Sequence, residues 1–190
     1  MKNYTSCFLG IPLPKEYIKE FGQLLKDIHS TDPFIEIVKP STPHITIYYL
    51  NNQSQYSLGE INNKIQPFIE ILKGITLVIR GVGYFTKDSP KVLFLDVKYP
   101  EALTEYRNTI SEVLKKYSAS DNNLPFHPHM TIGRIKSTQG KESFTTNEKK
   151  IALKINTVNW SFKIHEVALY GVDSTKLPEH QEKLITISVR

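Results

Sequence analysis

The sequence predicts an α+β fold made of two pseudo-symmetric lobes, each a small antiparallel sheet covered by helices, with a central cleft. Two short signals recur about 85 residues apart in a chain of 190 residues, which indicates an internal repeat. Each half carries a segment with the spacing of an amphipathic helix. Each half also ends in segments that alternate between apolar and polar residues, which is typical of antiparallel strands.

The first signal is an apolar strand pattern that ends in proline. Residues 8–14 (FLGIPLP) and 94–100 (FLDVKYP) both read Phe-Leu-x-(Ile/Val)-x-x-Pro and lie 86 residues apart. Each proline suits a helix start, where its missing N–H does no harm. The apolar residues that follow have helical spacing in both halves: Tyr17, Phe21, Leu24, Leu25 and Ile28, then Leu103, Tyr106, Ile110, Val113, Leu114 and Tyr117. We therefore expect a helix after each proline, with one face toward a core.

The later elements repeat less closely. Apolar residues within 61–72 predict a second helix, whereas its counterpart at 144–155 has a weaker pattern and 140–150 is expected to be partly loop. Residues 75–85 alternate, turn through 86–90 and continue into 91–97, which predicts a hairpin. Residues 160–171 are expected to form one strand that loops through 172–180 to 183–189. We expect one integrated domain over 1–190, with repeats at approximately 4–90 and 91–190.

The second signal is a histidine and a threonine set into strand-like segments. Both 43–50 (PHITIYYL) and 126–135 (FHPHMTIGRI) contain proline, histidine, an apolar residue, threonine and isoleucine. Residues i and i+2 of a strand share a face, so His44 lies beside Thr46, and His129 beside Thr131. A single His-x-Thr pair is ordinarily structural, but two copies in matched halves favour catalysis in a shared cleft. His127 has the strand parity of His129 and is expected to be structural.

Two imidazoles and two hydroxyls suit phosphate-ester chemistry. A neutral imidazole takes a proton from water, and a protonated one gives a proton to the leaving oxygen. The threonine hydroxyls can donate to phosphate oxygens. We expect no cofactor and no metal, because the motif lacks carboxylate ligands and the chain has no His-Glu-x-x-His or cysteine cluster.

Composition sets the broad class. The single cysteine, Cys7, excludes an internal disulfide. The sequence shows neither a secretory signal nor the roughly 18 consecutive apolar residues of a membrane span, so we expect a soluble, cytoplasmic monomer. A net charge of +5 and a pI of about 9.1 favour anionic partners such as nucleic acid. A merely solvated lysine-rich surface explains the same charge.

The segments CFLGIPLP, KPSTPHITIYYL, KVLFLDV, FHPHMTIGRI and EVALYGV together resemble the 2H phosphoesterases. Within them the chain most resembles the bacterial and archaeal RNA 2′,3′-cyclic phosphodiesterase group, also called the 2′-5′ RNA ligase or LigT-like group. The resemblance implies a metal-independent hydrolysis of 2′,3′-cyclic phosphate at RNA ends to a 2′-phosphate. It places His44 and His129 in catalysis, with His129 as the base, and Thr46 and Thr131 on the phosphate.

Two further site residues follow from the same segments. Arg134 matches a phosphate-contacting arginine of the group, although strand parity points it away from His129 unless a bulge at Gly133 turns it back; a surface salt bridge is the alternative. Tyr48 shares parity with His44, so it is expected to line the cleft and stack on a base unless it lies in the core or at the rim. Cleavage of 2′-5′ oligoadenylate or a cyclic oligonucleotide remains an alternative activity, and a non-catalytic RNA-binding module is a third.

Overall fold

The computed structural model describes residues 2–86, 92–119, 122, 125–173, 175 and 181–189, and these form an α+β fold. The strands are β1 (Asn3–Pro12), β2 (Glu36–Ile37), β3 (His44–Tyr49), β4 (Gln53–Ser54), β5 (Thr76–Phe85), β6 (Val92–Lys98), β7 (His129–Arg134), β8 (Asn159–Lys163), β9 (Glu166–Asp173) and β10 (Gln181–Ser188). The helices are α1 (Lys15–Thr31), α2 (Gln55–Ile65), the 3-10 segment η1 (Gln66–Leu72), α3 (Glu101–Val113), the 3-10 segment η2 (Lys115–Tyr117) and α4 (Thr138–Ile155).

The strands form a single curled antiparallel sheet in the order β10-β9-β1-β3-β7-β6-β5-β8, with β4 beside β1 and β2 beside β7. The two small sheets expected from the sequence are therefore joined. The join is narrow, because β3 and β7 pair only at Ile45 and Met130. Pairing these two strands removes two exposed edges from the middle of the molecule. We call β10-β9-β1-β3 the first half-sheet and β7-β6-β5-β8 the second half-sheet.

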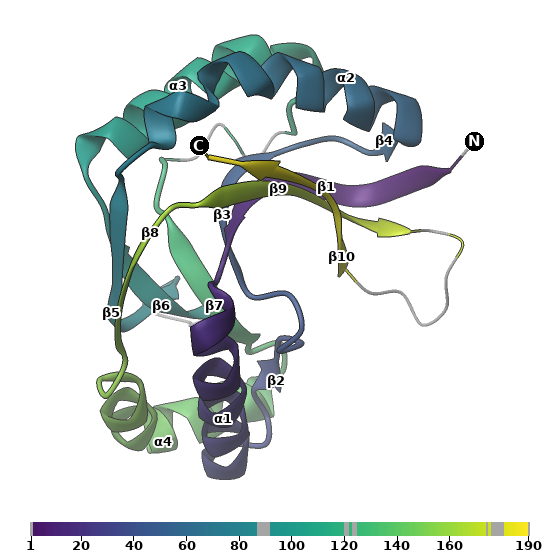
Figure 1. Cartoon of the computed structure of the whole chain (residues 1–190). Coiled ribbons are helices and arrows are strands. Elements are labelled where there is room, and N and C mark those ends of the chain that lie inside the picture. Colours follow the sequence, from purple (N-terminus) through teal and green to yellow (C-terminus); the bar gives the residue numbers. More distant parts are fainter. Residues whose placement is uncertain are drawn as a thin grey trace.

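The two halves of the chain exchange elements. β9 and β10, from the end of the chain, complete the first half-sheet around β1, whereas β5 pairs with β6 and β8 in the second. The helices also cross over: α1 follows β1 but packs against β8, where Tyr17 and Phe21 contact Trp160. α3 follows β6 and contacts β3. As a result, α2 and α3 cover one side of the molecule, and α1 and α4 cover the other (Figure 1).

The helical spacing in the sequence identified the correct faces of the two repeated helices. α1 begins directly after Pro14, and α3 begins directly after Pro100. Their buried residues are Phe21, Leu24, Leu25 and Ile28 in α1, and Leu103, Tyr106 and Ile110 in α3. The predicted second helix is also present, as α2 continued by η1. Both prolines therefore mark the point where the chain leaves one half-sheet to cover the other.

Two expectations about later elements were wrong. Residues 140–150 are helical, because Ser137 caps α4 by accepting a hydrogen bond from the amide of Gly140 at 2.9 Å. Residues 160–171 belong to two strands in different half-sheets: β8 at the edge of the second and β9 between β10 and β1 in the first. The break is visible in the spacing, since Ile164 and Val167 are both buried but lie three residues apart, which interrupts the alternation. The β5–β6 hairpin is confirmed, although most of its turn and of the loop before β10 lies outside the described residues.

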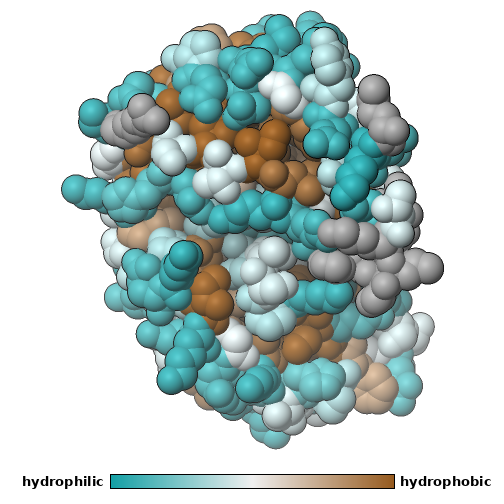
Figure 2. Space-filling view, turned by 45° about the vertical axis from the view of Figure 1, so that its right-hand side comes forward, coloured by the Kyte–Doolittle hydropathy of each residue, from teal (hydrophilic) through white to brown (hydrophobic). Residues whose placement is uncertain are grey.

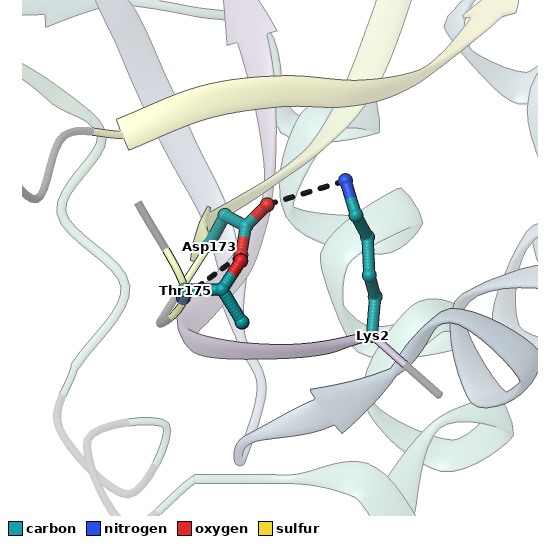
Figure 3. A network of polar contacts seen from close by, with 3 residues as sticks. All are labelled: Lys2, Asp173 and Thr175. Atoms are coloured by element: carbon teal, nitrogen blue, oxygen red, sulfur yellow. Dashed lines mark hydrogen bonds and ion pairs between the residues drawn. The ribbon is translucent and has the colours of Figure 1, made fainter. Parts of the chain in front are cut away.

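A buried carboxylate fastens the end of β9 (Figure 3). Asp173 is 2% exposed and accepts hydrogen bonds from the Thr175 hydroxyl at 2.6 Å and the Thr175 amide at 3.0 Å. Lys2 lies 3.3 Å from its other oxygen. The bonds from Thr175, followed by Lys2, lower the pKa of Asp173 to about 2. The carboxylate therefore stays charged at neutral pH and ties β9 to the beginning of the chain.

The hydrophobic core lies between the sheet and its two helix layers. On the face shown in Figure 2, uncovered hydrophobic residues form separate patches divided by hydrophilic ones. Within the described part of the chain, no helix is long and apolar enough to cross a membrane.

Candidate active site

Four of the predicted site residues meet where the two half-sheets join. A cavity of about 760 Å³ is lined by His44, Thr46, Thr131 and Arg134. An adjoining hollow of about 380 Å³ also reaches His44, Thr131 and Arg134. The strand crossing at β3 and β7 thus brings together residues that are 85 to 90 positions apart in the sequence. His129 is not among the residues that line either space, and its ring lies beside those of Phe85 and Phe94.

Each histidine is held in the same way. The Nδ1 atom of His44 lies 2.7 Å from the carbonyl oxygen of Thr42, and that of His129 lies 2.7 Å from the carbonyl oxygen of His127. Because a carbonyl oxygen only accepts, Nδ1 carries the proton in both rings. The Nε2 atom is then left free to take up or release a proton. In both segments a proline separates the histidine from the carbonyl residue, which fixes the backbone there.

Both imidazoles pack against a pair of aromatic rings. The centroid of the His44 ring lies 4.5 Å from that of the Phe8 ring and 5.1 Å from that of the Tyr170 ring. His129 has the matching arrangement, at 4.9 Å from Phe94 and 4.8 Å from Phe85. Phe8 and Phe94 open the first repeated sequence signal, so that signal encodes part of the site as well as part of the core. The other two rings come from β9 and β5, which the sequence did not single out.

The electrostatics of the two histidines favour their neutral forms. Burial lowers the pKa of both His44 and His129 from the ordinary value of 6.5, against the opposing effect of the bond to the carbonyl. The charge of His129 lowers the pKa of His44 further. His127 and Arg134 further lower the pKa of His129.

Matching irregularities follow the two motifs. In β3 the pairing with β1 skips Ile47, so that Leu9 faces Tyr48 and Gly10 faces Thr46. In β7 the pairing with β6 skips Ile132 in the same way. Such a bulge places two successive residues on the same side and reverses the parity beyond it.

The first bulge corrects the predicted position of Tyr48. Its side chain is 1% exposed and packs in the core, so it does not line the cleft. The next residue, Tyr49, lines the cleft instead, together with His44 and Thr46. The alternation of faces along a strand predicted the correct positions up to Ile47. It failed at the bulge, which the amino-acid sequence of this segment does not reveal.

The second bulge places Arg134 in the cleft, as expected if the strand were irregular near Gly133. Arg134 is exposed and lines both the cleft and the adjoining hollow. Gly133 is required there, because a Cβ atom would come within 3.0 Å of the backbone oxygen of Glu36 in β2. Tyr49 and Arg134 each lie five residues after their histidine, so they occupy equivalent positions in the two motifs.

The backbone of Tyr49 is held by a residue from a distant segment. Asn122 accepts from the amide of Tyr49 at 2.9 Å and donates to its carbonyl oxygen at 2.6 Å. Arg107 of α3 in turn donates to the carbonyl oxygen of Asn122 at 2.7 Å. The wall of the cleft at Tyr49 is therefore fixed from α3.

Two polar contacts distinguish the histidines and were not predicted. The side-chain amide of Gln181 lies 3.2 Å from Nδ1 of His44 and lines the cleft; because Nδ1 carries a proton, its amide oxygen is the suitable partner. His127, next to His129, lies 3.7 Å from Asp96. Gln181 follows a long loop, so nothing in the spacing of the sequence could have placed it beside His44.

The cleft carries polar groups that suit a phosphate ester. Imidazole, hydroxyl, amide and guanidinium groups line it, and these groups bind or protonate phosphate oxygens. Across the described ranges, no three His, Cys, Asp or Glu side chains are grouped so as to hold a metal ion.

A curled α+β sheet with a His-x-Thr pair from each half at its centre defines the class of the two-histidine phosphoesterases. The comparison with family models is direct: residues 19–176 match the 2′-5′ RNA ligase superfamily. The chain belongs to this superfamily.

Curated relatives carry a more specific name. A protein of Geobacillus stearothermophilus named RNA 2′,3′-cyclic phosphodiesterase is 25% identical over 175 residues, which cover 92% of this chain and 54% of the relative. This chain therefore corresponds to about half the length of that protein. A protein of the same name from Archaeoglobus fulgidus is 27% identical over 135 residues, covering 68% of this chain and 72% of the relative.

Solved structures show the same fold. A protein of Thermus thermophilus superposes with a TM-score of 0.71 at 17% identity, covering 100% of this chain and 98% of that one. Escherichia coli LigT in complex with 3′-AMP gives a TM-score of 0.71 at 19% identity, with 98% of each chain covered.

Proposed function

We propose that this protein is a phosphodiesterase that hydrolyses 2′,3′-cyclic phosphate at RNA ends to a 2′-phosphate without a metal ion. The observation that carries the proposal is the pair of imidazoles on the adjoining strands β3 and β7, each with Nδ1 bonded to a carbonyl, which leaves Nε2 for proton transfer. The names of the curated relatives and the net charge of +5 support the choice of substrate.

The proposed reaction needs one neutral and one protonated imidazole. The neutral imidazole takes a proton from a water molecule as that water attacks phosphorus. The bond between phosphorus and O3′ breaks, and the protonated imidazole gives its proton to O3′. The product carries a free 3′-hydroxyl and a 2′-phosphate, and proton exchange with water restores the starting states.

We assign His129 as the base and His44 as the acid. His129 lies near the positive charge of Arg134, which disfavours its protonated form and keeps it ready to accept a proton. The pKa of His44 is lowered by burial and by the charge of His129, but not by an arginine or a lysine. The negative charge of a bound cyclic phosphate would raise the pKa of His44. His44 would then be protonated and could give its proton to the leaving oxygen.

The remaining cleft residues divide into phosphate and base contacts. Thr46, Thr131 and Arg134 provide hydroxyl and guanidinium donors for the phosphate oxygens. Tyr49 takes the base-stacking role first given to Tyr48, because its ring lines the cleft and its backbone is fixed by Asn122. The fixed backbone keeps this ring at the wall of the cleft, where a base can stack on it.

The test is a substrate panel with excess EDTA. The purified protein is incubated with an oligonucleotide that ends in 2′,3′-cyclic phosphate, with a linear 2′-5′ oligoadenylate and with a cyclic dinucleotide. We expect turnover of the first, with the 2′-phosphate as the product. Preferential cleavage of either other substrate would reassign the activity, and strict dependence on added metal would contradict the mechanism. Binding of RNA with turnover of none would leave the protein a binding module.

A further inference from the structure

A second cavity lies next to the candidate active site, between the beginning of α1 and the turn from β8 to β9. It measures about 410 Å³, within the range of small-molecule sites. Thr42 and Pro43 line both this cavity and the hollow at His44, so the two spaces meet at the segment that holds the imidazole. We call it the side cavity.

The side cavity combines an apolar wall with unpaired positive charge. Ile18 of α1 and Phe162 of β8 contribute apolar surface. Lys15 and Lys163 also line it, and neither takes part in an ion pair with any other described residue. The carboxylate in the lining, Glu166, is engaged by Lys183 at 2.7 Å. An apolar wall beside free ammonium groups is complementary to a nucleotide, which has a flat base and an anionic phosphate.

The side cavity has two sets of polar groups that could hydrogen-bond to a ligand. Tyr170 lines it, and its hydroxyl is fully buried without a hydrogen-bond partner among the described residues. Buried hydroxyls are rarely left in this state. In addition, α1 begins after Pro14 with no side-chain cap. The amide of Tyr17 donates to the carbonyl oxygen of Pro14 at 3.0 Å, and the amides of Lys15 and Glu16 remain available to an anion. The Tyr170 ring also contacts His44, which joins this site to the catalytic one.

We propose that the side cavity is a second nucleotide subsite, which binds the nucleotide adjoining the terminal one in an oligonucleotide substrate. This proposal rests on the proposed function. The base of the second nucleotide packs on Phe162 and Ile18, and its phosphate lies between Lys15 and Lys163. The Tyr170 hydroxyl hydrogen-bonds to the ribose or the base.

The experiment compares two substrates with the same terminal base, a nucleoside 2′,3′-cyclic phosphate and a tetranucleotide that ends in one. The variant carries Lys15→Glu and Lys163→Glu together. We expect kcat/KM for the tetranucleotide to fall about tenfold, mainly through KM, as for lost charge-assisted contacts. The nucleoside substrate should react within about twofold of the parent rate, because it does not reach the side cavity. Ile18→Trp, which narrows the cavity without a charge change, should produce the same selective loss.

A binding measurement separates this proposal from the proposed function. Anisotropy of a labelled tetranucleotide bearing the 2′-phosphate reports binding whether or not the protein turns over substrate, and the double variant should bind it about tenfold more weakly. The control, Lys64→Glu with Lys115→Glu, changes two exposed lysines on α2 and η2 that line neither the side cavity nor the cleft. Unchanged binding in the double variant, an equal loss for both substrates, or an equal loss in the control would overturn the subsite. If the double variant binds the tetranucleotide more weakly than the parent but the parent turns over no substrate, only the proposed function would be overturned.

Discussion

His44 and His129 have matching contacts to a backbone carbonyl and to aromatic rings, but different residues follow them along their strands. Both rings donate Nδ1–H to a carbonyl two residues earlier and pack against a pair of aromatic rings that contact each other. Beyond each motif a bulge turns the fifth residue into the cleft, but that residue is Tyr49 in one half and Arg134 in the other. The repeat thus supplies two imidazoles in equivalent positions, and in the proposed function their unequal neighbours give each a different task.

The largest expected effect comes from removing either imidazole. His44→Ala and His129→Ala should each lower kcat about a hundredfold or more, since general acid–base groups typically contribute 10² to 10⁴. The measurement is steady-state hydrolysis of a cyclic-phosphate oligonucleotide, with circular dichroism to show that each variant is folded. A loss below about fivefold in one variant would break the equivalence of the two halves. His29→Ala, on the last turn of α1, is the matched control.

Arg134 tests the difference between the halves. Arg134→Gln should lower kcat/KM about 10- to 100-fold, because hydrogen bonds to charged groups contribute about 1.5–3 kcal/mol. Arg134 lowers the pKa of His129, so its removal should raise that pKa. If His129 is the base, it must be deprotonated to act, and the acidic limb of the kcat/KM profile should move to higher pH.

The control for charge is Arg134→Lys, which keeps the cation and should leave the acidic limb in place. Arg80→Gln removes an exposed guanidinium from β5 and should change neither the rate nor the profile. An acidic limb that stays fixed or moves to lower pH in Arg134→Gln would contradict the assignment of His129.

Each threonine should contribute less to kcat/KM than Arg134 does, and the two threonines should contribute by similar amounts. Thr46→Val and Thr131→Val each remove one neutral donor of similar volume, for which we expect a loss of about tenfold in kcat/KM. Thr→Ser at the same positions keeps the hydroxyl and should retain most of the activity. A loss at one threonine that matches the loss of a histidine would show that the phosphate is held mainly by one half of the molecule.

Tyr49 and Tyr48 give the smallest and most selective effect. Tyr49→Leu should raise KM about five- to tenfold for the preferred base, because stacking on an aromatic ring contributes about 1–3 kcal/mol per base. Tyr49→Phe keeps the ring and should behave almost as the parent. Tyr48→Phe, in the core, should leave KM unchanged. A KM effect at Tyr48 that exceeds the one at Tyr49 would restore the position expected from strand parity.

The sequence was sufficient for the features that local spacing controls. The periodic apolar residues of α1 and α3 located both helices, and the two motifs located His44 and both threonines in one cleft. The exchange of strands between half-sheets could not be seen in this manner, because it depends on which strand edges meet in space. The interruption between Ile164 and Val167 was the one readable sign of it.

The site residues that were misplaced or missed depend on long-range geometry. The bulge at Ile47 moved Tyr48 into the core, and it is specified by pairing with β1 rather than by the residues of β3. Gln181 lines the cleft, Tyr170 contacts His44, and Asn122 holds the backbone of Tyr49, all from segments that carry no repeated motif. The repeat therefore locates the two imidazoles that we propose as proton-transfer groups, while the residues that distinguish the two halves appear only in the folded chain.

The most direct test of the division of labour uses a cyclic-phosphate substrate in which sulfur replaces the leaving O3′. A thiolate leaves without needing a proton, so the acid becomes dispensable and the base does not. We predict that this substrate restores most of the rate of His44→Ala relative to the parent and little of that of His129→Ala. The opposite pattern would exchange the two roles, and restoration of neither variant would contradict the central claim that the two imidazoles act as an acid–base pair.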